Sequence, residues 1–157
     1  MAKFVKSLWR LSAVVLALAV LGGCAGQIPY YIQAKHPYER KMYGNYDKIA
    51  DAARQVLVRN GWPIQRVTDA SVFERTTTEG EDTEKDILIF TGIRKHWMVI
   101  WPTYTRLNVF VHPTAEGANV DLRWAKVTPF LIKFQNFRND ALAKRLLEQM
   151  EEELTIK

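Results

Sequence analysis

The chain has 157 residues, of which 48% are hydrophobic and 25% are charged, and it carries a formal net charge of +5. This length fits one domain with a substantial hydrophobic core. Three of the positive charges, Lys3, Lys6 and Arg10, lie at the very start of the chain, and no clustered basic face follows them. The composition therefore argues against a nucleic-acid-binding protein, which would concentrate its positive charge on one surface.

The first segment has the layout of a secretory signal peptide. A basic start leads into an apolar run over residues 11–21, which is too short for a helix that crosses a bilayer, since about 20 residues are needed. Gly22 and Gly23 then offer a small, open backbone to a peptidase, and Cys24, the only cysteine, follows at once. We expect cleavage between Gly23 and Cys24. An ordinary signal peptide cleaved near Ala25, or an uncleaved anchor, is the alternative.

The residues Leu21 to Cys24 resemble the lipobox of bacterial lipoproteins. The resemblance implies that Cys24 carries a thioether-linked diacylglycerol and a fatty acyl group on its amino nitrogen. Two or three acyl chains anchor a protein stably, since each buried methylene contributes about 0.8 kcal/mol. Ala25 rather than aspartate follows the cysteine, which by the same resemblance implies the periplasmic face of the outer membrane. The lipid would occupy the one thiol, so no cysteine remains for a disulfide or a metal site.

Residues 24–44 show no helical or alternating pattern, and their glycines and prolines predict a tether that lifts a domain of residues 45–157 off the membrane. Tyr30, Tyr31, Tyr38 and Tyr43 are unusual in a solvated linker. They either pack back on the domain, contact a partner or the membrane interface, or belong to a disordered segment.

A helix is predicted over residues 46–60. Asn45 is a suitable N-cap, Asp47 opposes the helix dipole in the first turn, and Gly61 is a typical C-terminal stop. The residues that follow are rich in β-branched and aromatic side chains, which favour strands. The expected strands cover residues 64–68, 72–79, 86–91, 97–111 and 119–127.

The clearest hairpin joins residues 106–112 to residues 120–126 through a loop at 113–118. Alternation places Leu107, Val109 and Val111 on one face, with Val120, Leu122 and Trp124 on the matching face of the partner strand. Asn108, Asp121 and Arg123 would then face mostly water.

The run from Phe130 to Phe134 leads into a final helix, which is capped at Asn136 or Asn139 and carries an apolar stripe. The predicted fold class is therefore α+β, with an antiparallel sheet of about five strands and both helices packed on its one apolar face.

The segment from Arg94 to Tyr104 is apolar on both faces if it is one extended strand. Alternation would place Trp97 with Trp101 on one side and Met98 with Ile100 on the other. It is either a central strand, in part under the tether tyrosines, or an exposed aromatic patch. In the second case Trp97, Trp101 and Tyr104, flanked by Arg94 and Lys95, form a candidate binding site for a protein partner or lipid headgroups.

The order of elements and the run from Tyr46 to Ile64, with its Asn60-Gly61-Trp62-Pro63 turn, resemble envelope lipoproteins with a BamC-like domain. These have a helix-grip module that is also similar to the TATA-binding-protein fold. The resemblance implies a role beside outer-membrane assembly machinery, although this chain has one such domain and lacks a long N-terminal partner-binding region.

We find no motif for catalysis in the sequence. His36, His96 and His112 have no metal-ligand spacing, the glycines are isolated, and Ser71 lacks the frame of a nucleophilic serine. We therefore expect a non-catalytic protein without a cofactor other than the lipid on Cys24. The first hypothesis is a protein-interaction or assembly module that binds another envelope protein. The second is a module that binds a lipid or a small amphiphile between the helices and the sheet.

Overall fold

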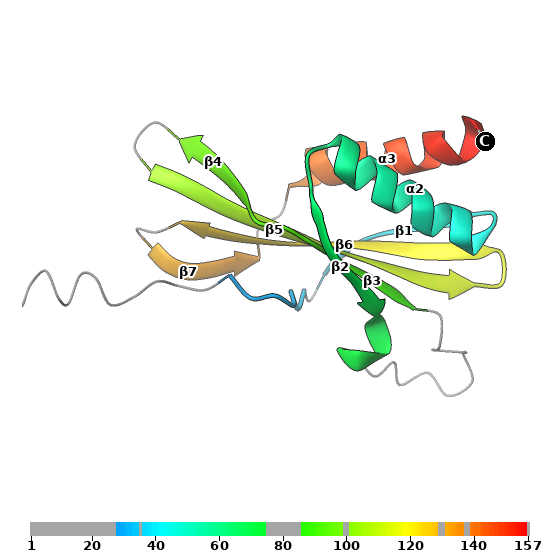
Figure 1. Cartoon of the computed structure of the whole chain (residues 1–157), viewed down its shortest axis with the longest axis horizontal. Coiled ribbons are helices and arrows are strands. Elements are labelled where there is room, and N and C mark those ends of the chain that lie inside the picture. Colours follow the sequence, from blue (N-terminus) through cyan, green and yellow to red (C-terminus); the bar gives the residue numbers. More distant parts are fainter. Residues whose placement is uncertain are drawn as a thin grey trace, which may run out of the picture.

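The computed structural model describes residues 28–34, 36–74, 86–98, 101–128, 131–136 and 139–156. Within them the predicted α+β class is confirmed, since one antiparallel sheet carries two helices (Figure 1). The predicted signal peptide, with Gly23 and Cys24 at its cleavage site, lies outside the described residues.

Five strands form the central part of the sheet, in the order β1-β6-β5-β3-β2, and two further strands join it at one end. The strands are β1 (Tyr38–Tyr43), β2 (Ile64–Asp69), β3 (Ile87–Thr91), β4 (Arg94–Met98), β5 (Trp101–Thr114), β6 (Gly117–Thr128) and β7 (Leu131–Asn136). All of their pairings are antiparallel.

Three stretches differ from the sequence prediction. The single strand expected over residues 97–111 is two strands, because Met98 of β4 pairs with Trp101 of β5. Val72, the first residue of the strand expected over 72–79, belongs to a 3₁₀ helix (η1, Ala70–Val72) that Asp69 caps through a 2.8 Å bond from the Ser71 amide, and residues 75–79 of that strand lie outside the described residues. Residues 131–136 form β7 instead of an approach to the last helix.

The β5–β6 hairpin is confirmed, and its apolar residues share one face as predicted. Leu107 lies opposite Trp124, and Val109 lies opposite Leu122. Its connection is tighter than the predicted loop over 113–118, because Thr114 already pairs with Gly117. The close approach of β1 explains the glycine, since a Cβ at this position would lie 2.0 Å from the Met42 carbonyl oxygen.

Local signals at the ends of both helices agree with the structure. Helix α2 (Tyr46–Arg59) begins where the Asn45 side chain accepts the Lys48 amide at 3.2 Å. It ends in a Schellman motif, in which Gly61 has φ +74° and the Trp62 amide donates to the Leu57 carbonyl at 2.9 Å. Helix α3 (Asp140–Ile156) is capped by Asn139, one of the two predicted caps, whereas the other, Asn136, ends β7.

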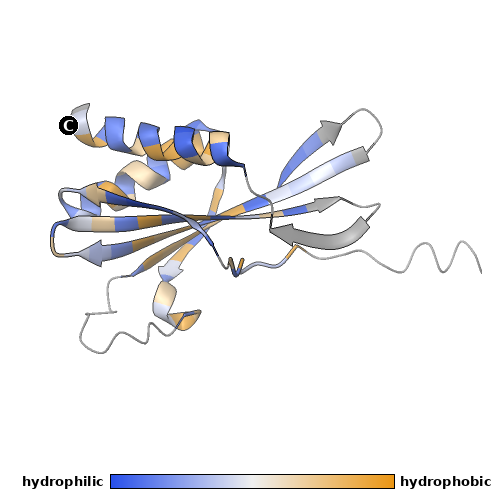
Figure 2. Ribbon diagram, turned by 180° about the vertical axis from the view of Figure 1, so that it is seen from behind, coloured by the Kyte–Doolittle hydropathy of each residue, from blue (hydrophilic) through white to orange (hydrophobic). Residues whose placement is uncertain are grey.

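Both helices cover the predicted apolar face of the sheet, and Figure 2 shows apolar residues on the side of α3 that faces it. The core between the helices and the sheet consists of side chains from α2, α3, β1, β3, β5 and β6, together with Trp62 from the link between α2 and β2, and all of them are at most 4% exposed. Its members include Ile49, Val56, Leu57, Trp62, Leu107, Val109, Val111, Val120, Leu122, Trp124, Leu146 and Met150.

The opposite face of the sheet is covered as well, which corrects the prediction that Asn108, Asp121 and Arg123 face water. Asn108 is fully buried, and the other two are only 6% exposed. Residues 28–34, which we call the N-terminal strap, lie over this face together with residues 70–74. The Tyr30 ring stacks on Phe90 at 4.2 Å, and Ile32 is 2% exposed.

The predicted tether over residues 24–44 is therefore wrong for much of its length. The strap packs on the sheet, and residues 38–43 form the edge strand β1, whose Tyr38 lies opposite Leu122 of β6. Of the readings offered for the tyrosines, packing back on the domain is confirmed for Tyr30, Tyr31 and Tyr38, which make ring contacts with the domain.

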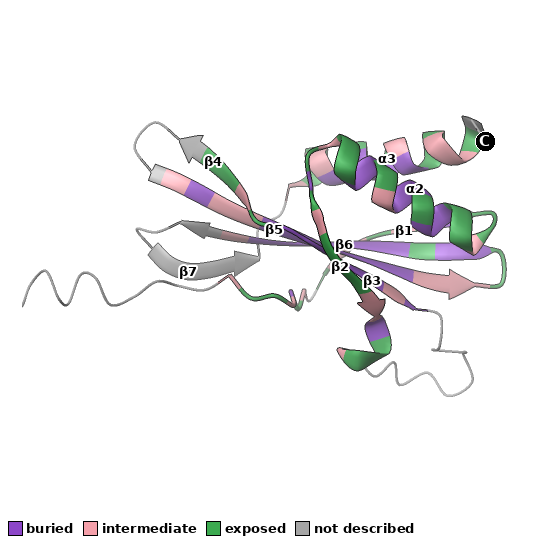
Figure 3. Cartoon of the chain, in the orientation of Figure 1, coloured by how far each residue is buried: buried purple, intermediate pink, exposed green. Residues whose placement is uncertain are grey.

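One end of the sheet extends beyond the helices (Figures 1 and 3). Among the described residues, β4 pairs only with β5, and β7 pairs only with β6. This end, which we call the distal end, consists of β4, β7 and the adjoining parts of β5 and β6.

Candidate functional site

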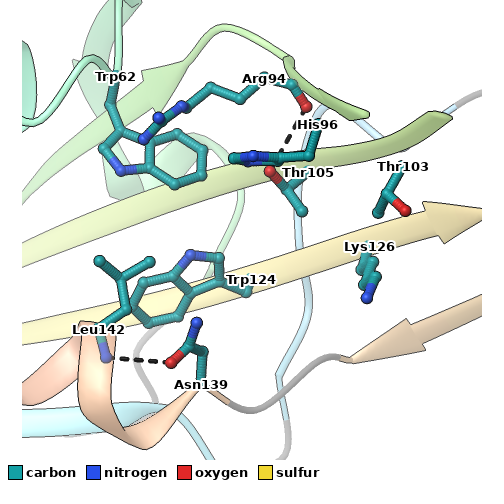
Figure 4. Close-up of a pocket in the computed structure, with 9 residues that line it drawn as sticks. All are labelled: Trp62, Arg94, His96, Thr103, Thr105, Trp124, Lys126, Asn139 and Leu142. Atoms are coloured by element: carbon teal, nitrogen blue, oxygen red, sulfur yellow. Dashed lines mark hydrogen bonds between the residues drawn. The ribbon is translucent and has the colours of Figure 1, made fainter. Parts of the chain in front are cut away.

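A groove opens where the distal end meets the helix layer (Figure 4). Its volume is about 240 Å³. The lining residues come from the link between α2 and β2, from strands β4, β5 and β6, and from the start of α3. They are Trp62, Arg94, His96, Thr103, Thr105, Trp124, Lys126, Asn139 and Leu142. We refer to this site as the Trp62–Trp124 groove.

Strand register explains why these side chains meet. Arg94 of β4 lies opposite Thr105 of β5, and Thr105 lies opposite Lys126 of β6, so three neighbouring strands contribute to one face. Residues opposite each other in antiparallel strands point to the same side of a sheet. Trp124 is two positions before Lys126 and shares this face. Trp62 reaches the site from the link between α2 and β2, because the Schellman motif turns the chain at Gly61.

Two basic side chains, Arg94 and Lys126, line the groove. The Arg94 guanidinium lies 4.8 Å from the centre of the Trp62 ring and donates to the Asn60 carbonyl at 2.9 Å. Lys126 adds a second cation, and none of the described lining residues is a carboxylate. An anionic group would therefore be attracted to this site.

The two tryptophans that face each other across the groove have unpaired indole nitrogens. Trp62 is 1% exposed and Trp124 is 4% exposed, and neither Nε1 atom has a hydrogen-bond partner. A buried donor without an acceptor costs about 1–3 kcal/mol. Figure 4 shows the Trp124 nitrogen on the edge of the ring that points toward Trp62. The groove thus combines an apolar floor with two donors that lie directly beneath its surface, and a ligand oxygen would reach them once neighbouring side chains move aside.

The five residues predicted as one partner-binding patch divide between two faces. Arg94 lines the groove, whereas Lys95 and Tyr104 lie opposite each other on the other face, with the Lys95 amine 6.0 Å from the Tyr104 ring centre. Trp97 pairs with Pro102 and Trp101 pairs with Met98 at the distal end. The side chains of these two tryptophans lie outside the described residues.

Sequence reasoning missed the groove because each of its two tryptophans already has another explanation in the sequence. The following Pro63 marks Trp62 as part of a turn, and alternation with Val120 and Leu122 marks Trp124 as a core residue. Both assignments are correct, but the same side chains also form the floor of the site. One signal in the sequence could have indicated the groove. A basic side chain, Lys126, occupies a strand position whose alternation places it on the same face as Trp124.

A second polar cluster lies on the strap side of the sheet. Arg123 pairs with both oxygens of Glu74 and lies 3.5 Å from the Asp121 carboxylate, with its guanidinium 3.7 Å from the Phe110 ring centre. The Tyr31 hydroxyl also donates to Glu74. Although burial works in the opposite direction, the hydrogen bonds from Arg123 and Tyr31 hold the pKa of Glu74 below its usual value.

Two further hydrogen bonds attach the strap to the sheet. The Arg106 guanidinium donates to the Pro29 carbonyl at 3.0 Å, and the Asn108 amide donates to the Tyr30 carbonyl at 3.2 Å. Burial and then the Glu74 carboxylate raise the pKa of Tyr31 to about 12, so this hydroxyl remains a donor at neutral pH. We assign this cluster a structural role.

His112 makes the stability of this face depend on pH. Its Nδ1 atom lies 2.9 Å from Asp86, and its Nε2 atom lies 3.6 Å from Asp121. Asp121 and then Asp86 raise the pKa of His112 to about 9, although burial opposes the shift. Because the folded pKa is above the usual 6.5, the stabilisation is complete below pH 6.5 and is lost as the pH rises through about 9.

We therefore expect the free energy of unfolding to fall by roughly 3 kcal/mol between about pH 6 and pH 10 through this histidine. Urea unfolding over this range checks the prediction, with His112→Gln as the control. The free energy of unfolding of the wild-type protein should exceed that of the variant near pH 6, and this difference should disappear as the pH rises. A constant difference between the two proteins across the range would show that His112 does not titrate in this way.

No protein-family model and no curated protein matches the chain. Among the described residues, no helix has the length and apolar composition needed to cross a bilayer. The same part of the chain holds no group of three His, Cys, Asp or Glu side chains placed to bind a metal ion. The likeness to BamC-like lipoproteins and the lipid on Cys24 therefore stay predictions from the sequence.

Proposed function

We propose that the protein is a non-catalytic, lipid-anchored envelope protein at the periplasmic face of the outer membrane, and that its domain binds a small anionic amphiphile in the Trp62–Trp124 groove. The location rests on the sequence around Cys24. The binding function rests on one observation above all, which is the pair of buried indole N–H groups that lack an acceptor beneath a basic rim.

The lining of the groove indicates the chemistry of the ligand. Trp62, Trp124 and Leu142 offer apolar surface, and Arg94 and Lys126 favour a negative charge. Specific ligand sites commonly combine a mostly apolar wall with a few polar groups that fix orientation. The volume of about 240 Å³ is below the usual range for a whole drug-sized ligand, so the groove suits a short molecule or the acidic end of a longer one.

This proposal favours the second of the two hypotheses drawn from the sequence. A groove between the helix layer and the sheet is the place where that hypothesis locates an amphiphile. Binding of another envelope protein stays a prediction. The absence of catalysis is likewise part of the proposal, since we can name no set of nucleophile, base and orienting group.

Matched ligands of opposite charge test the proposal. Decyl phosphate and decyltrimethylammonium, each below its micelle concentration, are titrated calorimetrically into residues 25–157 made without lipid. We expect the phosphate to bind and the ammonium compound not to bind. Lys126→Gln should weaken phosphate binding by about tenfold, the equivalent of one charge-assisted contact.

Lys95→Gln is the control, because it removes the same charge from the other face of the same sheet end. Its affinity for decyl phosphate should equal that of the wild-type protein. Equal binding of the two decyl compounds, or equal losses in both lysine variants, would contradict the proposed site.

A further inference from the structure

We infer that the Trp62–Trp124 groove selects a doubly charged phosphate monoester over singly charged anions, and that the phosphate lies at the N-terminus of α3 beside Asn139. This inference rests on the proposed function, because it concerns the same groove. It adds the chemical class of the anionic group, the place where that group is held and a residue that sets the preference.

The N-terminus of α3 borders the groove. Asn139 caps the helix, since its Oδ1 atom accepts the Leu142 amide at 3.0 Å, and both residues line the site. A helix N-terminus carries about half a positive charge and attracts phosphate groups. Helix α3 has 17 residues, so its dipole is well developed. The Asp140 carboxylate in the same turn is exposed and is not among the lining residues.

The side chain of Asn139 also offers a donor to the groove. Its oxygen is occupied by the cap, and Figure 4 shows its nitrogen pointing toward the Trp124 ring. This nitrogen has no hydrogen-bond partner among the described residues. The indole nitrogens of Trp62 and Trp124 point to an oxygen-bearing ligand independently of the helix, because they are buried and lack an acceptor.

The charges around the groove favour two negative charges on the ligand. Arg94 and Lys126 supply two cations, and none of the described lining residues is a carboxylate. A phosphate monoester carries close to two negative charges above pH 7, and its three terminal oxygens accept strong hydrogen bonds. A sulfate ester or a carboxylate carries only one negative charge. Because electrostatic attraction increases in proportion to the ligand charge, the doubly charged ligand should gain most from this site.

Three ligands with ten-carbon chains test the preference. Decyl phosphate, decyl sulfate and decanoate, each below its micelle concentration, are titrated calorimetrically at pH 8 into residues 25–157 made without lipid. We expect decyl phosphate to bind about tenfold more tightly than either singly charged compound, which corresponds to one additional charge-assisted contact. Inorganic phosphate is titrated in parallel and should bind about a hundredfold more weakly than decyl phosphate, because it has no methylene groups to bury.

Asn139→Asp tests the place of the phosphate. Aspartate is as good an N-cap as asparagine, so the helix is retained, but the donor that faces the groove becomes a carboxylate oxygen. We expect the affinity for decyl phosphate to fall by about tenfold and the affinity for decyl sulfate to fall by about threefold, because the repulsion scales with ligand charge.

Asn45→Asp is the matched control. Asn45 caps α2 in the same way, through the Lys48 amide at 3.2 Å, and it is not among the residues that line the groove. The affinities of this variant for all four ligands should equal those of the wild-type protein. Circular dichroism checks that both variants fold.

Each outcome of these titrations has a separate meaning. Equal affinities for the three decyl compounds, or equal losses in the two aspartate variants, would overturn this inference and leave the anion-binding groove of the proposed function intact. Failure of every decyl anion to bind would overturn the proposed function and this inference together. Equal affinities for inorganic phosphate and decyl phosphate would support the phosphate preference but assign the site to free phosphate instead of an amphiphile.

Discussion

Replacing Arg123 by methionine is expected to lower the free energy of unfolding by about 3 kcal/mol. The side chain is 7% exposed and pairs with Glu74 and Asp121 while it lies over the Phe110 ring. Methionine retains the length and the apolar contacts, but it leaves the Glu74 carboxylate without its cation and leaves Asp121 with His112 alone. Urea unfolding followed by circular dichroism measures the loss.

Arg40→Met is the matched control for this prediction. Arg40 pairs with Glu151 at 3.0 Å, but both side chains are more than 30% exposed. Exposed ion pairs contribute about 0–1 kcal/mol, so this variant should remain close to wild type. Losses of equal size in the two variants would mean that the cluster around Arg123 is not a buried, stabilising network.

Ile32→Ala is expected to destabilise the protein by about 2–4 kcal/mol, because it removes a buried side chain from the strap. The residue is 2% exposed although it lies in a stretch that the sequence presents as a tether. Loss of the strap would also uncover Phe90, which the Tyr30 ring contacts, and Phe110, which the Tyr31 ring contacts. Thermal or urea unfolding measures the change.

The substitution His36→Ala is the control, since residue 36 lies just after the strap and is exposed. Surface substitutions usually change stability by no more than about 0.5 kcal/mol. A tether that did not pack on the sheet would make the two variants equally harmless. That result would restore the tether interpretation for residues 28–34.

Local signals were sufficient for much of the fold. Asn45 and Gly61 mark the ends of α2 through their own hydrogen bonds and backbone angles, which depend on few other residues. The β5–β6 hairpin is readable because Leu107, Val109 and Val111 alternate with polar residues. These features lie within one element or between neighbours in sequence, where periodicity and capping rules apply.

The remaining features depend on contacts between distant segments. Asn108 and Arg123 alternate with core residues and so look solvent-facing, but the strap and Glu74 cover them. The pairing of Met98 with Trp101 has no local signal in the sequence, because the intervening residues are valine and isoleucine and not glycine, proline or asparagine. Trp62 and Trp124 meet only because α2, β6 and α3 pack together, which a single sequence does not reveal.

The indole N–H resonances of Trp62 and Trp124 test the central claim most directly. In a nitrogen–proton correlation spectrum of the lipid-free protein, assigned with single Trp→Phe variants, decyl phosphate should shift both resonances downfield at a common saturation point. The signals of Trp97 and Trp101, at the distal end, should change little. Unchanged Trp62 and Trp124 resonances at saturating decyl phosphate, or equal shifts with decyltrimethylammonium, would contradict the assignment of the groove as an anion-binding site.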